Sequence, residues 1–138
     1  MEQNLELKTQ WGTTEQVRLE INQYMNNACI YIGLVSYEDS CPEPYGDLTV
    51  NLDGKVPDYC GYVDTNNMPE LEKFIEENRI GTFTGLVKQS GYCTYPLYLF
   101  DAARLRELCP DGMAIYERNI SKSSTEVKHE HKKSERTR

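Results

Sequence analysis

The chain has 138 residues, of which 38% are hydrophobic and 27% are charged, the size and composition of one ordinary globular domain. It has 15 Lys and Arg against 22 Asp and Glu, for a formal net charge of −7. The last 20 residues hold six basic and three acidic side chains, which leaves −10 on residues 1–118. Such an acidic body repels phosphate backbones, so direct binding of nucleic acid by the body is not expected.

The N-terminal residues 1–10 are acidic and polar, unlike a secretory signal. The longest apolar run, residues 28–35, is far shorter than the roughly 20 residues of a membrane-spanning helix. We therefore expect a cytoplasmic protein with no membrane partner. The cysteines are odd in number and form no CxxC pair, which favours reduced thiols over disulfides and gives a metal site no support. They are Cys29, Cys41, Cys60, Cys93 and Cys109.

The first half of the chain is dominated by alternating apolar and polar side chains, the pattern of half-buried strands. Val17, Leu19 and Ile21 alternate in this way, and residues 28–35 are almost continuously apolar, as in a central strand. Asparagine tolerates positive φ, so Asn26–Asn27 is expected to turn between these two strands. Further strands are predicted at residues 48–52, 61–64, 84–88 and 95–100, with a loop at residues 36–46.

Helices are predicted later in the chain. Apolar residues at positions 71, 74 and 75 form one helical stripe, with Asn66 or Asn67 as the expected N-cap before Pro69. This helix is expected to end at Asn78 or Gly81. Asp101 is expected to cap a second helix that Pro110 stops, and a third short helix is predicted at residues 112–118.

Strands followed by helices predict an α+β fold, a mostly antiparallel sheet with two or three short helices on one face. We expect one acidic domain over residues 1–118. Residues 119–138 are basic and contain almost nothing to bury, so they are predicted to be a disordered tail.

The chemistry available to the predicted domain is limited. Both histidines, His129 and His131, lie in the predicted tail, so the body has no imidazole for a nucleophile system or a metal site. No P-loop, GxGxxG or HExxH motif is present. Catalysis by carboxylates, lysine or tyrosine remains open, with an enzyme that uses paired carboxylates as an alternative. We predict no catalytic residue, no metal and no cofactor, and a protein that is not an enzyme.

An acidic stretch from residue 37 to residue 77 is the first candidate site, with eleven acids against two lysines. Side chains two apart on a strand lie about 6.8 Å apart, comparable to successive phosphates, so such acids can imitate a nucleic-acid backbone. Tyrosines interleaved among them are favoured interface anchors. A merely solubilising surface is the alternative. The candidate partner-binding residues are Glu38, Asp39, Glu43, Tyr45, Asp47, Asp53, Asp58 and Tyr59.

A second candidate site is a cluster of short polar residues between a strand and a helix. Asp64, Asn66 and Asn67 can bind a small ligand such as a nucleotide, with Ser90 and Tyr92 from the next aromatic segment. A turn with an N-cap requires the same residues, so structure and function remain alternatives here.

The segments PYGDLTVNL (44–52), YVDTNN (62–67), TG (84–85) and SGYCTYPLYLFD (90–101) resemble a domain-of-unknown-function family over about residues 15–117. Members of that family are small proteins carried by conjugative elements and prophages of gut bacteria. The resemblance implies accessory cargo of mobile DNA, and brings no catalytic residues. Small acidic proteins of this class often resemble inhibitors of host defence. We therefore expect an anti-CRISPR-like inhibitor that blocks the basic surface of a CRISPR effector or another defence nuclease.

Overall fold

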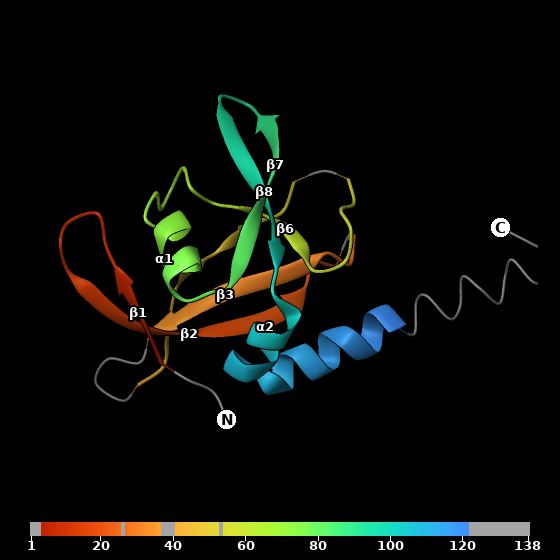
Figure 1. Ribbon diagram of the computed structural model, residues 1–138, viewed down its shortest axis with the longest axis horizontal. Coiled ribbons are helices and arrows are strands. Elements are labelled where there is room, and N and C mark those ends of the chain that lie inside the picture. Colours follow the sequence, from red (N-terminus) through yellow and green to blue (C-terminus); the bar gives the residue numbers. More distant parts are fainter. Residues whose placement is uncertain (1–3, 26, 37–40, 53, 122–138) are drawn as a thin grey trace, which may run out of the picture.

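A computed structural model describes residues 4–25, 27–36, 41–52 and 54–121. It contains two four-stranded antiparallel sheets and three helices, which confirms the α+β class (Figure 1). The chain order is β1 (Leu5–Lys8), β2 (Thr14–Gln23), β3 (Ile30–Ser36), β4 (Glu43–Asp47), β5 (Thr49–Val50), β6 (Cys60–Val63), α1 (Leu71–Glu77), β7 (Gly81–Ser90), β8 (Cys93–Phe100), α2 (Ala102–Leu108) and a C-terminal helix over residues 110–121.

The first sheet has the order β1-β2-β3-β4. Its centre is the β2–β3 hairpin, whose strands were predicted from their alternation and their apolar run. Within the described part of the connecting turn, Ala28 has a positive φ and Asn27 accepts a hydrogen bond from the Cys29 amide at 3.1 Å. Asn26 lies outside the described residues. Two strands were not predicted. No element was expected at Leu5–Lys8, which forms β1, and β4 occupies most of the described part of the expected loop at residues 36–46.

The chain passes from the first sheet to the second at Leu48, which is completely buried. Its amide donates to the Ile32 carbonyl in β3 at 2.9 Å, and its carbonyl accepts from the Asp64 amide, just past β6, at 3.0 Å. The predicted strand over residues 48–52 is therefore wrong in extent, because only Thr49–Val50 is a strand. The second sheet has the order β5-β6-β8-β7, and its β7–β8 hairpin projects away from the body (Figure 1).

The helices cover the apolar faces of the sheets and close one continuous core. The predicted stripe on α1 is buried, but the N-cap position is Glu70, with no side-chain cap, because the helix begins only at Leu71 and Asn66 and Asn67 lie too far before it. The side-chain amides of both asparagines donate within the preceding turn and to β8. Asp101 caps α2 as predicted, accepting from the Arg104 amide at 3.2 Å. Pro110 ends α2 but also begins the next helix, a position that needs no amide donor.

The C-terminal helix is longer than the predicted residues 112–118 and lies along β2. Its Asn119 side chain donates to Gln23 at 2.9 Å. The helix continues to residue 121, three residues past the expected domain end, and residues 122–138 of the predicted tail lie outside the described residues. None of the helices described is long and apolar enough to cross a membrane.

Candidate functional site

The expected partner-binding residues on β4 do not share one face. Glu43 pairs with Ser36 of β3, whereas Asp47 pairs with Gly33, three residues earlier. Side chains alternate along a strand, so partners three apart point to opposite faces. The register shift between Leu34 and Val35 produces this split. Glu38, Asp39 and Asp53 lie outside the described residues.

The remaining β4 residues make contacts within the chain. The Tyr31 hydroxyl donates to Asp47 at 2.7 Å, and burial together with that carboxylate raises the pKa of Tyr31. Tyr45 is half-buried and packs against the core, and burial raises its pKa, with Glu15 and Glu70 adding to the effect. Tyr45 therefore supports the fold more than it offers an exposed anchor.

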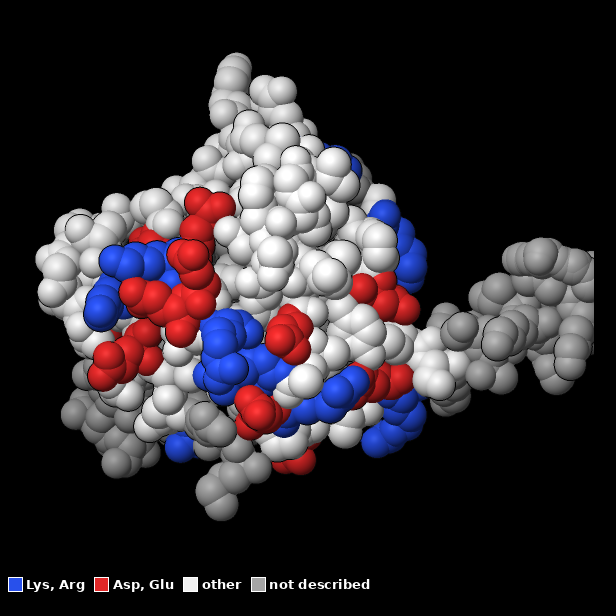
Figure 2. Space-filling view, in the orientation of Figure 1, with Lys and Arg blue, Asp and Glu red and all other residues white. Residues whose placement is uncertain are grey.

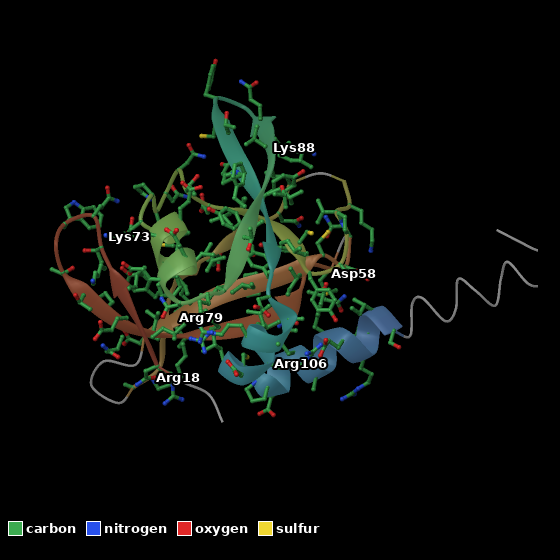
Figure 3. The ribbon with its side chains drawn as sticks, in the orientation of Figure 1. Arg18, Asp58, Lys73, Arg79, Lys88 and Arg106 are labelled. Carbon is green, nitrogen blue, oxygen red and sulfur yellow. The ribbon has the colours of Figure 1, made fainter. Side chains whose placement is uncertain are left out.

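Tyr59 is held by the C-terminal helix. Its amide donates to the Tyr116 hydroxyl at 2.9 Å, and its own hydroxyl donates to Glu117 at 2.6 Å. Arg106 donates to both oxygens of Glu117, at 2.9 and 2.7 Å. Asp58 is exposed beside this network, and Figure 3 places it on the opposite side of the view from Lys73 of α1. The five described candidates, Glu43, Tyr45, Asp47, Asp58 and Tyr59, thus form no single acidic face.

The Glu117 network predicts a pH-dependent contribution to stability. Hydrogen bonds from Arg106 and Tyr59 hold the pKa of Glu117 below its ordinary value of 4.5. The stabilisation is therefore present above that value and is lost as pH falls through the lower folded-state pKa. We expect Glu117→Gln to cost about 1 kcal/mol of unfolding free energy at pH 7 and less below pH ~4.

Urea denaturation across pH measures this difference. Glu107→Gln is the control, because the Glu107 side chain is 60% exposed and, among the described residues, forms its ion pair with Arg104 at 3.1 Å. It should change stability by at most a few tenths of a kcal/mol. A cost of Glu117→Gln that does not vary with pH would contradict the assignment.

The expected ligand residues are divided between two places. Asp64 and Asn67 meet in the turn after β6, where the Asn67 amide donates to Asp64 at 2.8 Å. Asn66 reaches the neighbouring strand and donates to the Thr94 carbonyl of β8 at 3.1 Å. Ser90 and Tyr92 lie at the tip of the β7–β8 hairpin, and Tyr92 is fully exposed. The structure brings the three polar residues of the turn together, and both asparagine amides are used to hold it.

A different acidic surface lies on α1, within the acidic stretch of residues 37–77 but outside the predicted partner-binding residues. Exposed Glu72, Glu76 and Glu77 form what we call the acidic wall. Figure 2 shows a red cluster over α1 with blue side chains beside it, and Figure 3 labels Lys73 on this helix. Lys73 is 3.9 Å from Glu77. The density of glutamates between residues 70 and 77, four against one lysine, was the available signal.

An open groove of about 630 Å³ separates α1 from β7. Glu72, Lys73 and Glu76 line one side, and Phe83 and Tyr98 are on the other. The Tyr98 hydroxyl donates to Glu72 at 2.9 Å, and burial, with Glu72 next, raises the pKa of Tyr98. The centroids of the Phe83 and Tyr98 rings are 5.7 Å apart. The groove thus combines carboxylates with aromatic surface, a combination suited to a basic and partly apolar protein segment.

The described residues offer little else for chemistry. They contain no group of three or more His, Cys, Asp or Glu placed to hold a metal ion. Cys60 and Cys109 are buried, and burial, helped by Asp58, raises the pKa of the Cys60 thiol. The predicted absence of a catalytic residue stays a prediction.

A family model described as "Domain of unknown function (DUF4313)" matches residues 18–120. This confirms the resemblance to a domain-of-unknown-function family and agrees closely with its expected extent. No curated protein and no solved structure matches the chain.

Proposed function

The chain belongs to the DUF4313 family of domains of unknown function, and from that premise we propose that it is a non-enzymatic accessory protein of a mobile genetic element that inhibits a host defence nuclease in the cytoplasm. The target is a CRISPR effector or another nuclease with a basic surface that normally holds nucleic acid. Inhibition is stoichiometric, because the protein occupies that surface and does not turn over a substrate.

The observation that supports this proposal is the acidic wall beside the α1–β7 groove. Its glutamates are exposed, and Lys73 on the same helix is 3.9 Å from Glu77. The charge of −10 over residues 1–118 adds a long-range attraction for a basic partner and a repulsion of free nucleic acid. Acidic side chains arranged in this way can pair with the Lys and Arg that otherwise hold phosphates.

Charge reversal on the acidic wall tests the proposal. In a DNA-cleavage assay with purified CRISPR effector and restriction nucleases, the wild-type protein should inhibit at least one of them near equimolar ratio. Glu76→Lys with Glu77→Lys should raise the inhibitory concentration about tenfold or more, because close interfacial charge pairs are replaced by like charges. Inhibition should also weaken as salt rises from about 50 to 500 mM, because the Debye length shortens and the attraction between the charges is screened.

The matched control is Glu6→Lys with Glu20→Lys, which makes the same charge change at exposed positions of the other sheet. This variant should inhibit within about twofold of wild type, apart from a small loss of long-range attraction. Equal inhibition by the wall variant and wild type would refute a role for the wall. Inhibition far below stoichiometric amounts would refute a non-enzymatic mechanism.

One observation favours the small-ligand function as a second candidate. The Asp64 Oδ1 atom is buried and has no hydrogen-bond partner among the described residues. A bound nucleotide base or amine could donate to it. A thermal-shift screen of nucleotides tests this, because a ligand at 100 times its dissociation constant adds about 2.7 kcal/mol of stability. No shift with any nucleotide, or an equal shift with Asp64→Asn, would reject the site.

A further inference from the structure

Strand β7 is an exposed edge of the second sheet. It pairs with β8 on one side, and no other described strand pairs with it on the other. All six residues from Thr82 to Val87 are exposed, which is unusual for a strand because one face of a strand is normally buried.

The exposed side chains on β7 are mostly apolar. Phe83, Leu86 and Val87, which we call the hairpin patch, are 46%, 62% and 59% exposed. Figure 2 shows a broad surface without charge over the hairpin, next to the red acidic wall. Natural edge strands are usually protected by charges or prolines, whereas β7 has Lys88 as its one charged residue and has no proline. An apolar edge left open in this way marks an interaction surface.

The register places part of the hairpin patch on the same side as the acidic wall. Phe83 is opposite Tyr98 and Val87 is opposite Pro96. Tyr98 and Pro96 are two apart on β8 and share a face, so Phe83 and Val87 share it too. The hydrogen bond from Tyr98 to Glu72 identifies this face as the one toward α1. Apolar and acidic contacts are therefore available to one bound segment.

We propose that β7 and the α1–β7 groove dock an extended segment of a partner protein that carries alternating apolar and basic side chains. The apolar side chains contact the hairpin patch, and the basic ones face Glu72 and Glu76 across the groove. This inference rests on the proposed function. It adds where on the protein the partner is bound and by what chemistry. Exposed strand edges bind extended segments of this kind in many recognition domains.

Two observations favour such a partner over a second copy of this chain. Each copy carries a net charge of −7, so two copies repel each other, while a basic segment is attracted. The register shift between Phe83 and Val87 also interrupts the edge, with Gly85 at φ 92° inside it. An interrupted edge supports only a short ladder with its own copy, whereas a segment held mainly by side chains tolerates the irregularity.

The test is fluorescence anisotropy with a labelled twelve-residue peptide of alternating Val and Lys, added to the full chain. We expect saturable binding that weakens at least tenfold when Glu replaces Lys in the peptide. Val87→Ser should weaken binding about tenfold, because it removes most of one buried valine contact on the face toward α1. Ile115→Ser is the matched control, since Ile115 is 52% exposed on the C-terminal helix, and it should bind as wild type does.

Two charge-reversal variants complete the test. Glu76→Lys should weaken peptide binding about fivefold, and Glu6→Lys should leave it within twofold, provided circular dichroism shows all variants folded. Equal binding by Val87→Ser and Ile115→Ser would overturn the proposed site. A dimer in sedimentation that Val87→Ser dissociates would assign the edge to a second copy and overturn the partner segment.

The nuclease assay separates this inference from the proposed function. If Val87→Ser inhibits a nuclease as well as wild type does, the docking site is wrong while the inhibitory function stands. If the peptide binds at this site but no nuclease is inhibited, the site stands and the proposed function is wrong.

Discussion

Replacing Phe100 by alanine is expected to lower the free energy of unfolding by about 3–5 kcal/mol, the range for truncating a buried aromatic ring. Phe100 is only 2% exposed and lies at the end of β8, where the second sheet meets the core. Its ring lies against two glycines, 3.2 Å from where a Cβ of Gly61 would be and 3.1 Å from that of Gly81. Because glycines have no side chain to move into the vacated space, the cavity should persist.

Urea denaturation followed by circular dichroism measures this loss. Leu99→Ala is the control, since it truncates the neighbouring residue of the same strand, which is 51% exposed, and should cost about 1 kcal/mol or less. A loss for Phe100→Ala no larger than that for Leu99→Ala would mean that the ring does not hold the second sheet to the core.

Gly112→Val is expected to destabilise the protein by about 2–3 kcal/mol, through overpacking between the C-terminal helix and β2. A Cβ at Gly112 would lie 2.8 Å from the Ile21 carbonyl oxygen and 3.0 Å from the Cys109 sulfur. A backbone atom cannot move aside as a flexible side chain can, so the helix must shift away from the sheet.

The smaller substitution Gly112→Ala tests the same contact by the sign of its effect on stability. On an open helix surface Gly→Ala stabilises by up to about 1 kcal/mol, whereas here Gly112→Ala should destabilise. Ala114→Val, at an exposed position of the same helix, corrects for the poorer helix propensity of valine and should cost less than about 1 kcal/mol. Thermal unfolding of the three variants gives the comparison, and a stabilised Gly112→Ala would show that the helix does not contact β2 as described.

Elements with a strong local pattern were predictable from the sequence. The alternation of Val17, Leu19 and Ile21 and the apolar run before Val35 are β2 and β3, and the stripe on α1 is buried as its spacing predicted. Asp101 caps α2 because an N-cap needs only its own side chain and an amide three residues away. These features depend on neighbours in sequence, so the sequence alone determined them together with the α+β class.

The candidate site depended on contacts between distant residues. A register shift against β3 sends Glu43 and Asp47 to opposite faces of the sheet, and the Asn66 side chain donates to the Thr94 carbonyl, 28 residues away. From the sequence alone, the α1 glutamates indicate only the solvent-exposed face of a helix. The fold places β7 across a groove from them, and this makes them part of the candidate site. The sequence determined β2, β3, α1 and α2 by their local patterns, but not β1 or β4. Only the tertiary structure decided which acids share a surface and which strand is left open, because register and strand order arise from pairing between segments far apart in the chain.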